Sequence, residues 1–556
     1  MIRLTDLRLP LNHPPEALRA AVLVRLDISP EALGSVTVFR RAADARRRGG
    51  IQLIYTLDAE VTDEAALLAR FAGDPHVGLT PDMTYRLPVR APAGDWARPL
   101  VIGAGPCGLF AALTLAEMGF RPIVLERGKV VRERTADTFG FWRKGALNPE
   151  SNVQFGEGGA GTFSDGKLYS GIKDPAHLGR RVLQVFVRAG APEEIIWVNK
   201  PHIGTFRLVT VVEALRAEII RLGGEYRFGA RVERLLIEGA PRRIAGVRLA
   251  GGEEILASHV VLAPGHSARD LFTSLVESGV HVEKKPFSIG VRIEHPQSLI
   301  DRARYGADAG NRILGAADYK LVHHGGNGRS VYSFCMCPGG TVVAAASEPG
   351  GVVTNGMSQY SRAERNANAG IVVGIEPRDF PGDVLAGVEL QRRLEQAAFA
   401  AGGGTYRAPG QLVGDFLAGR ASTAFGDTVP SYKPGVVPCD LAAILPDYAV
   451  AAMREALPVF GRKIAGFDRG DAIMTGVETR TSAPIRVTRG GSLQSLNTQG
   501  LYPAGEGAGY AGGILSAAVD GIRVAEAVGL SLARGGRDAG GGLRRGTGDR
   551  GLRLRR

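Results

Sequence analysis

The sequence is poor in cysteine, tryptophan and aromatic residues as a class. It has four cysteines and three tryptophans among 556 residues, and aromatic residues make up 6%. Four cysteines are too few for a disulfide framework, and their spacing matches no zinc site, so we expect no metal ligands. No apolar run approaches the ~18–20 residues that cross a bilayer. The N-terminal MIRLTDLRLPLNHPP has no apolar signal region, so we expect a cytoplasmic protein.

The net charge of +12 is unevenly distributed along the chain. Residues 534–556 contain eight arginines and two aspartates and supply +6 of it. Because the end of the chain is rich in glycine and arginine, we expect residues 531–556 to be disordered. This tail is either simply solvated or an electrostatic handle for acidic partners. We expect nucleic acid to bind only nonspecifically through it, and the sequence indicates no oligomeric state.

The strongest local pattern is a strand, a glycine turn, a helix and a second strand. The short apolar run Pro99–Ile102 is typical of a buried parallel strand. In the G-x-G-x-x-G motif that follows, Gly103 permits the turn, Gly105 admits a pyrophosphate and Gly108 lets the helix pack on the strand. Glu126 ends the second strand, where a carboxylate can bind both ribose hydroxyls. The pattern predicts a dinucleotide site, with a structural glycine turn as the alternative.

A second region, residues 152–173, is dense in glycine and small polar residues and nearly lacks aliphatic ones. Such a stretch can lay backbone amides against a ligand, or it can be an ordinary surface loop. The residues in it that we expect to contact a cofactor are Gly158, Gly159, Gly161, Thr162 and Ser164. Asp165 and Lys167 are the charged residues expected at the reactive end of that cofactor.

A third region, Gly500–Val528, combines a strand, a glycine and an acid, more glycines and a helix of small residues. Glu506 is placed to meet the ribitol or pyrophosphate of a flavin nucleotide. The helix that begins near Ile514 would direct the positive end of its dipole toward the flavin pyrimidine. Earlier in the chain, Val260–Gly265 closes a strand on A-P-G, which is common where flavoproteins return to the adenine side. These late segments favour a flavin enzyme over a simple NAD dehydrogenase.

The chain divides into several predicted units. Residues 1–90 follow the order βαββαβ, which predicts a ferredoxin-like α+β module with a docking or regulatory role. A linker is expected at 91–99. A discontinuous Rossmann-like FAD-binding domain is expected at 100–279 and 466–530. A mixed α/β substrate domain is expected as an insertion at 280–465.

Three places in the sequence supply candidate catalytic residues besides Lys167. Cys335 and Cys337 would share one face of a strand, so they are either a redox-active pair or two buried thiols. His202 precedes a helix and is either a ligand contact or a packing residue. The remaining cysteines, Cys107 and Cys439, are given no catalytic role, and Cys107 is most simply a small apolar filler in the glycine turn.

Together these segments resemble the bacterial family called uncharacterised FAD-dependent dehydrogenases, which belongs to the glutathione-reductase-like, two-dinucleotide-binding flavoproteins. The resemblance is carried by VIGAGPCGLFAALTLAEMG, SNVQFGEGGAGTFSDGKLYS, KPHIGTFRL, YSFCMCPGG and LYPAGEGAGYAGGILSAAVDG, which span most of residues 98–530. It implies FAD and a redox reaction, and it implies no particular substrate.

The resemblance also implies positions for the cofactor. The pyrophosphate would bind at Gly103, Gly105 and Gly108, the ribose at Glu126 and the adenine at the Val232 backbone. The ribitol and isoalloxazine would lie along Gly505, Glu506 and Ile514. The other expected FAD contacts are Ala104, Pro106, Cys107, Arg127, Gly158, Gly159, Gly161, Thr162, Ala263, Gly265, Gly512 and Gly513.

The sequence therefore predicts an FAD-dependent dehydrogenase or reductase. A hydride would pass between flavin N5 and a small organic substrate, with Lys167, His202, Cys335 and Cys337 as catalytic candidates. No second G-x-G-x-x-G with its βαβ frame occurs, so NAD(P)H would act as donor only by binding transiently at the flavin face. The alternatives are a flavoprotein that acts on tRNA, as in the glucose-inhibited division family, and a non-catalytic FAD-binding redox sensor.

Overall fold

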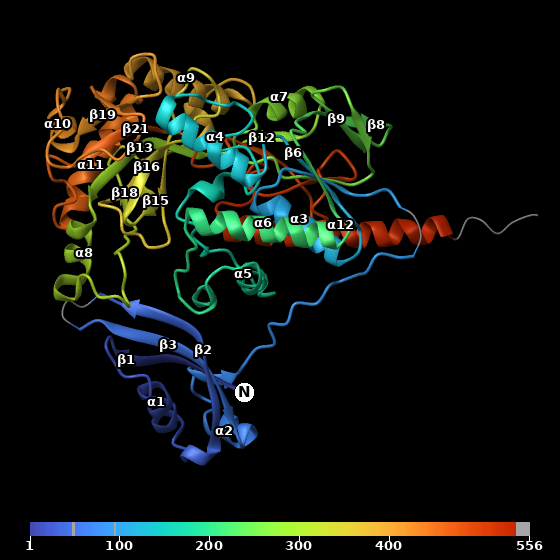
Figure 1. Ribbon diagram of the computed structural model, residues 1–556, viewed down its shortest axis with the longest axis vertical. Coiled ribbons are helices and arrows are strands. Elements are labelled where there is room, and N and C mark those ends of the chain that lie inside the picture. The colour runs from blue at the N-terminus through green and yellow to red at the C-terminus, as the bar shows by residue number, and fades with distance from the viewer. Residues whose placement is uncertain (47–49, 94–95, 541–556) are drawn as a thin grey trace, which may run out of the picture.

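The computed structural model describes residues 1–46, 50–93 and 96–540, and the N-terminal module forms a separate lobe (Figure 1). Its elements are β1 (Ile2–Pro10), α1 (Ala17–Leu26), η1 (Pro30–Ala32), β2 (Leu33–Asp44), β3 (Gln52–Val61), α2 (Glu64–Arg70) and β4 (Val77–Leu79). The strands form one antiparallel sheet in the order β2-β3-β1-β4. The order of elements is the predicted one. The module contacts the rest of the chain where Arg40 donates to Asn199 and Arg41 lies over the Trp197 ring.

The centre of the main body is a five-stranded parallel sheet. Its order is β23 (Leu501–Pro503), β11 (Val260–Leu262), β5 (Leu100–Ile102), β6 (Ile123–Glu126) and β7 (Glu225–Phe228). Four of these strands, β23, β11, β5 and β6, are buried and largely apolar, as is typical of parallel strands covered on both faces, whereas the edge strand β7 is polar and half-buried. Val101 and Val124 face a helical layer that includes α3 (Pro106–Glu117), α6 (Thr205–Arg221) and α12 (Ile514–Gly540).

The alternate residues of the same strands, such as Leu100 and Ile102, pack on the opposite side. That side is covered by α7 (Arg269–Glu277) and by an antiparallel sheet of β8 (Val232–Glu238), β9 (Arg243–Leu249) and β10 (Glu254–Leu256). The segments around this core include α4 (Val131–Lys144), η2 (Ala160–Phe163), α5 (Leu178–Arg188) and η3 (Glu193–Ile196). The arrangement is the mixed α/β architecture that the sequence predicts.

The inserted domain is built on a seven-stranded sheet. Its order is β14 (Val322–His324), β15 (Ser330–Cys337), β18 (Asn366–Ile375), β13 (Phe287–Pro296), β21 (Ile473–Glu478), β19 (Ala408–Leu412) and β20 (Val436–Pro438). The other elements of the inserted domain lie between these strands in the sequence. They are α8 (Gln297–Tyr305), η4 (Gly306–Asp308), β16 (Gly340–Ala344), β17 (Thr354–Ser358), η5 (Pro377–Asp379), α9 (Ala386–Ala401), α10 (Val413–Ala418), η6 (Leu441–Ala443) and α11 (Asp447–Lys463). A two-stranded ladder of β12 (Val282–Lys284) and β22 (Ile485–Val487) joins it to the first domain.

Two predicted boundaries are wrong. β21 pairs with β13 and β19, so the insertion extends beyond residue 465. The sequence of a short apolar strand does not reveal which sheet the strand will join.

α12 continues to Gly540, so residues 531–540 are helical where a disordered tail was expected. Extending an existing helix needs no new nucleation, which is the costly step of helix formation. The rest of the predicted tail, 541–556, and residues 94–95 of the linker lie outside the described residues.

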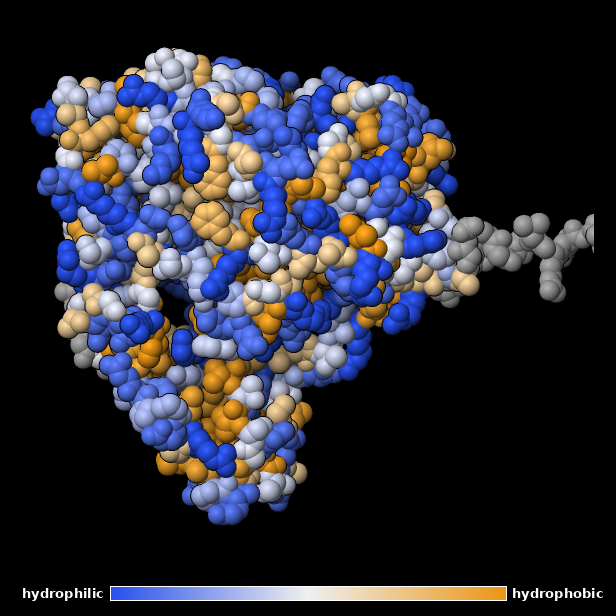
Figure 2. Space-filling model, in the orientation of Figure 1, coloured by the Kyte–Doolittle hydropathy of each residue, from blue (hydrophilic) through white to orange (hydrophobic). Residues whose placement is uncertain are grey.

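Among the described residues, no helix combines the length and apolar character needed to cross a bilayer. On the face shown in Figure 2, hydrophilic residues predominate and apolar residues form small patches.

Candidate functional site

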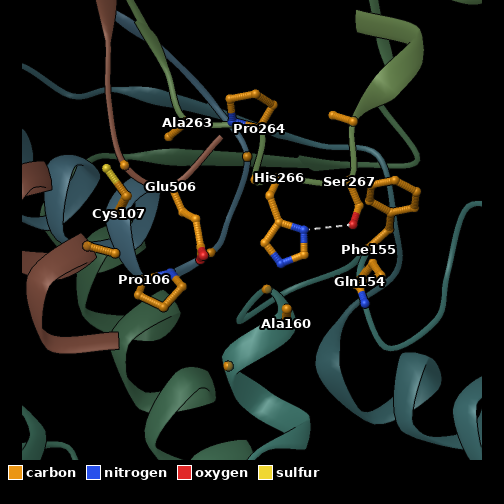
Figure 3. A pocket seen from close by; sticks show the side chains of 18 of the residues that line it. Pro106, Cys107, Gln154, Phe155, Ala160, Ala263, Pro264, His266, Ser267 and Glu506 are labelled. Carbon is orange, nitrogen blue, oxygen red and sulfur yellow. Dashed lines mark hydrogen bonds between the residues drawn. The ribbon is translucent and has the colours of Figure 1, made fainter. Parts of the chain in front are cut away.

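One cavity of about 410 Å³ lies between the parallel sheet and the inserted domain, and Figure 3 shows part of its wall. It is lined by the glycine turn after β5, the glycine-dense stretch, the loop between β11 and α7, the end of β15 and the beginning of α12. The cavity therefore joins the three segments that the sequence singles out, together with residues from the inserted sheet.

The glycine turn has the geometry that its spacing predicts. Gly103 has a φ of 97°, and a Cβ on it would lie 2.3 Å from the Ala263 carbonyl oxygen. A Cβ on Gly108 would lie 1.9 Å from the Gly103 carbonyl oxygen, so the helix packs directly on the turn. Gly105 is the N-cap of α3. The first N–H groups of α3 have no acceptor within the helix, and they begin at the cavity wall.

Residues 152–168 of the glycine-dense stretch are buried or half-buried, so the surface-loop alternative is wrong for them, whereas residues 169–173 are exposed. The buried Arg134 guanidinium donates to the backbone carbonyls of Asn152, Val153 and Glu157 at 2.7 Å each. These bonds fix the stretch from inside the protein. A Cβ on Gly159 would lie 2.8 Å from the Gly105 Cα, so bare backbone of one segment packs against bare backbone of the other.

Glu126 marks one end of the cavity. Its carboxylate accepts the backbone N–H groups of Ala104 and Gly128 at 2.8 Å and of Gly156 at 3.0 Å. The Glu126 side chain thereby ties β6 to the glycine turn and to the glycine-dense stretch. Each carboxylate oxygen has two lone pairs, so Oε2, with one bond in the structure, can accept a further donor.

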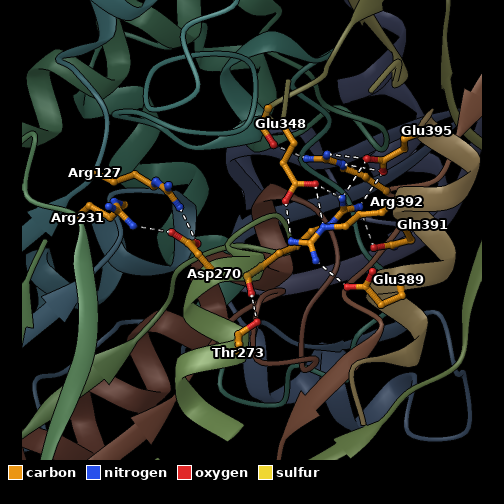
Figure 4. Close-up of polar contacts among 12 residues, drawn as sticks. Arg127, Arg231, Asp270, Thr273, Glu348, Glu389, Gln391, Arg392 and Glu395 are labelled. Carbon is orange, nitrogen blue, oxygen red and sulfur yellow. Dashed lines mark hydrogen bonds and ion pairs between the residues drawn. The ribbon is translucent and has the colours of Figure 1, made fainter. Parts of the chain in front are cut away.

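Two arginines flank the same end of the cavity. Arg127 lies over the Phe155 ring, with 3.9 Å from Cζ to the ring centroid, and it pairs with Asp270 at 3.0 Å. Arg231 pairs with the other oxygen of Asp270 at 3.2 Å. Figure 4 shows the three charged side chains side by side. Their charges are thus partly neutralised, and Arg127 presents a flat surface beside the cavity.

The C-terminal segment forms the opposite wall. Glu506 points into the cavity (Figure 3), and burial raises its pKa to about 8 against the opposing effect of Lys285. A Cβ on Gly512 would meet no protein atom within 4 Å, and the same holds for Gly513. Ile514 then begins α12. This wall therefore offers bare backbone, a helix N-terminus and a carboxyl group that can be protonated at neutral pH.

Charged residues gather at the other end of the cavity, around Lys167. Its ammonium lies 3.6 Å from Asp165 and donates to the Met336 carbonyl. Asp165 in turn accepts both a 2.9 Å bond and a second bond from Arg362. Burial lowers the pKa of Lys167, but the neighbouring Cys335 and the other anionic groups outweigh burial and shift that pKa upward. Lys167 is therefore a fixed positive charge.

Cys335 lines the cavity at this end, whereas Cys337 is completely buried. The expectation that the two share a face of a regular strand is wrong, because the pairing of β15 with β18 shifts between Phe334 and Cys337. Cys335 has a φ of 41° at this bulge. The two residues nevertheless contact each other, because Cys337 Sγ donates to the Cys335 carbonyl oxygen at 3.3 Å.

A completely buried arginine supports the bulge from behind. Arg292 donates to both carboxylate oxygens of Glu478, at 3.0 and 3.1 Å, and to the Cys335 carbonyl at 2.9 Å. It also donates to Asn355 and Asn368. The Arg292 side chain therefore fixes the backbone at Cys335 and brings a second positive charge to this end of the cavity.

The cavity brings together most of the residues predicted from the sequence. Those that line it are Gly103, Gly105, Pro106, Cys107, Glu126, Arg127, Gly159, Gly161, Ser164, Asp165, Lys167, Val232, Ala263, Gly265, Cys335, Gly505, Glu506, Gly512, Gly513 and Ile514. Those that do not line it are Ala104, Gly108, Gly158, Thr162, His202 and Cys337. Gly108 and Gly158 allow the segments that form the cavity walls to pack closely, because a Cβ on either would collide with neighbouring atoms.

His202 is not brought to the cavity. Its Nε2 is 2.9 Å from the Tyr360 carbonyl oxygen, and its ring stacks on Tyr360 with 5.3 Å between centroids. Burial and Arg362 lower its pKa. The packing alternative therefore describes this side chain, and the suggestion that it is catalytic is not supported by its position.

Other residues line the cavity without having been singled out. His266, beside the A-P-G strand end, is hydrogen-bonded to Ser267, and burial lowers its pKa to about 3. Asn355 and Arg480 reach the cavity from the inserted domain. His266 follows a segment that was singled out and could have been inferred, whereas the positions of Asn355 and Arg480 depend on long-range pairing. The described residues contain no cluster of histidine, cysteine and acidic side chains that could hold a metal ion.

Comparison with known proteins places this geometry in a family. Residues 286–481 match the family described as "FAD-dependent protein, C-terminal domain-like", and residues 1–60 match a domain of unknown function, DUF8436. The matched range 286–481 includes β21 and agrees with the corrected extent of the insertion. An uncharacterized protein of Clostridium beijerinckii is 46% identical over 527 residues, which cover 94% of this chain and 98% of that protein.

Solved structures show weaker similarity. PqsL of Pseudomonas aeruginosa, solved with 2-aminobenzoylacetate, is 13% identical with a TM-score of 0.31, over 80% of this chain and 88% of that chain. A geranylgeranyl bacteriochlorophyll reductase-like protein from Thermoplasma acidophilum is 12% identical with a TM-score of 0.34, over 79% of each chain. Similarity at this level defines no reaction. The extensive match to the Clostridium protein does define membership, and the chain belongs to the same family as that protein and carries the C-terminal domain of FAD-dependent proteins.

Proposed function

We propose that this protein is an FAD-dependent oxidoreductase that transfers a hydride between the flavin and a small organic substrate. The observation that carries the proposal is one continuous cavity of about 410 Å³, with the glycine turn and Glu126 on its wall and Lys167 and Cys335 at its far end. Because the chain carries a domain of FAD-dependent proteins, FAD is the ligand that we assign to this cavity.

The cavity residues fit FAD chemically. The first turn of α3 offers unpaired N–H groups and a positive dipole end to a pyrophosphate. Gly265, Gly512 and Gly513 line the cavity, and a Cβ on any of them would meet open space, so a ligand can approach their backbone. In this assignment Glu126 would hold the adenosine ribose, Val232 would meet the adenine by its backbone, and Glu506 would meet the ribitol.

FAD supplies the hydride chemistry when it is bound, and the protein supplies position and charge. The start of α12 brings a positive dipole end to the flavin end of the cavity, where it stabilises negative charge. Lys167 adds a fixed positive charge that Asp165 holds in place at 3.6 Å. Phe334 and Asn355, from the inserted domain, close this end of the cavity. The substrate would therefore bind between the two domains.

An anaerobic experiment tests the proposal and identifies the electron donor. The purified protein, supplied with FAD, is mixed separately with NADH and NADPH, and the flavin absorbance is followed. Bleaching by one nucleotide would make that nucleotide the donor, and screening of electron acceptors would follow. If neither acts, bleaching by a metabolite from a substrate screen would support a dehydrogenase. A bound flavin that no donor reduces and no acceptor oxidises would overturn the proposal in favour of a non-catalytic FAD-binding sensor.

A further inference from the structure

Two of the four cysteines meet at the flavin end of the cavity. Cys335 lines the cavity wall, and Cys337 does not line it and has none of its surface exposed. The register shift in β15 interrupts its regular pairing with β18 at these two residues. A positive φ at a residue other than glycine is uncommon, and it persists only where the surroundings impose it. At Cys335 those surroundings are the bonds from Arg292 and Cys337.

The surroundings of the two thiols differ in a way that suits disulfide chemistry. The hydrogen bond from Cys337, together with Lys167 and Arg292, outweighs burial and holds the pKa of Cys335 well below its ordinary value. The same contact with Cys335, with burial, raises the pKa of Cys337. These opposite directions favour the thiolate form at Cys335 and the thiol form at Cys337. A thiolate is the reactive form of cysteine in disulfide formation.

The other two cysteines provide a contrast. Burial raises the pKa of Cys107 well above its ordinary value and that of Cys439 to about 11. All four cysteines are free, and among the described residues the one cysteine–cysteine hydrogen bond runs from Cys337 to Cys335. The combination of a paired partner, positive charges and access to the cavity is therefore particular to Cys335.

We propose that Cys335 and Cys337 are a dithiol–disulfide couple that exchanges two electrons with the bound flavin. This inference rests on the proposed function, because it takes the flavin as the electron acceptor. In the oxidising direction, an S–S bond forms between the Cys335 thiolate and Cys337, and the S–H bond of Cys337 breaks. The two electrons and the Cys337 proton go to the oxidised flavin. In the reverse direction, the reduced flavin returns the two electrons and the proton, and the disulfide opens.

The inference assigns different roles to the two residues. Cys335 is the thiol that faces the flavin and any molecule that enters the cavity. Cys337 is the resolving thiol, which is protected from other reagents by its burial. Lys167 and Arg292 are positioning residues for the pair: both donate hydrogen bonds to backbone carbonyls of the bulge, and both stabilise the thiolate.

The couple predicts an electron count and a covalent change in the FAD-loaded protein. In an anaerobic titration with dithionite after oxidation, the wild-type protein should take up roughly four electrons per chain, two for the flavin and two for the disulfide. The variants Cys335→Ser and Cys337→Ser should each take up about two. Cys439→Ser is the matched control, because this thiol lies away from the cavity, and it should keep the wild-type count.

A second readout does not depend on electron transfer from the titrant. After oxidation, the protein is unfolded in denaturant so that the buried Cys337 is accessible, the free thiols are alkylated, and the peptides are analysed by mass spectrometry. We expect the Cys335–Cys337 peptide to carry an internal disulfide that reduction of the flavin opens. A wild-type protein that binds FAD, takes up about two electrons and leaves both thiols open to alkylation would overturn the couple while the proposed function stands. A protein that binds no FAD would overturn the proposed function, and the couple with it.

Discussion

A buried ion cluster joins the two large domains, and its central carboxylate offers a quantitative test of the structure (Figure 4). Glu395 lies on α9 of the inserted domain and is 2% exposed. Its carboxylate accepts bonds at 2.7 and 3.0 Å from Arg269, the first residue of α7. It also accepts bonds at 2.9 and 3.1 Å from Arg480 and a 2.8 Å bond from the Thr479 hydroxyl. One side chain thus receives five hydrogen bonds from both sides of the domain boundary.

The change Glu395→Gln keeps the shape of this side chain and removes its charge. Burial alone would raise the pKa of Glu395, but Arg480 and Arg269 outweigh it and hold that pKa well below its ordinary value. The variant leaves two buried guanidinium groups without their shared counter-charge, and removing one partner of a buried ion pair costs about 3–5 kcal/mol. Since a domain is stable by only about 5–15 kcal/mol, we expect a large fall in the free energy of unfolding.

Urea unfolding, followed by circular dichroism, measures the effect. The matched control is Glu389→Gln on the same helix, because Glu389 pairs with Arg392 at 2.6 Å but its side chain is 53% exposed. An exposed pair contributes at most about 1 kcal/mol, so the control should change little. If Glu395→Gln were no more destabilising than Glu389→Gln, the reasoning about this buried cluster would be refuted.

Three further predictions concern the cavity. Gly512→Leu would fill space that the ligand needs, so we expect FAD affinity to fall at least about tenfold, or ~1.4 kcal/mol, in a fluorescence titration. The control is Gly491→Leu, which should leave FAD affinity unchanged, because a Cβ on Gly491 also meets no atom within 4 Å. Equal affinities would place FAD elsewhere. Lys167→Met removes a positive charge beside Cys335, so the pH profile of Cys335 alkylation should shift toward higher pH. An unchanged profile would contradict the assigned charge. The raised pKa of Glu506, about 8, means that the folded FAD-free protein holds a proton that the unfolded chain releases at lower pH. The stability of the FAD-free protein should therefore decline as the pH rises from about 5 to 8. In urea titrations, Glu506→Gln should flatten this decline. An identical slope in both proteins would argue against a buried carboxyl group.

Local patterns predicted the parts of the site that local geometry determines. The turn at Gly103 needs a positive φ and a close approach to Ala263, so the spacing of the glycines directly predicts the backbone conformation there. The position of Glu126 at the cavity could be predicted because this residue ends a parallel strand. The residues around these two positions line the cavity because a strand, a turn and a helix are consecutive in the chain.

Long-range contacts explain what the sequence does not reveal. Arg292 meets Glu478 across 186 positions of the chain, and nothing local to either residue indicates the pairing. The orientation of His202 depends on Tyr360, 158 positions away. The bulge at Cys335 arises from the pairing of β15 with β18, so the C-x-C spacing indicated proximity of the thiols for the wrong reason. The predicted end of the insertion failed similarly, because a strand such as β21 does not encode its neighbours.

The most direct test of the central claim is the flavin content of the purified protein. The protein is incubated with FAD, freed of excess nucleotide, and its visible spectrum and bound FAD are measured. The cavity geometry predicts a yellow protein with about one FAD per chain, and a much lower content in Gly512→Leu. A folded protein that remains colourless after FAD is supplied would contradict the assignment of this cavity to FAD.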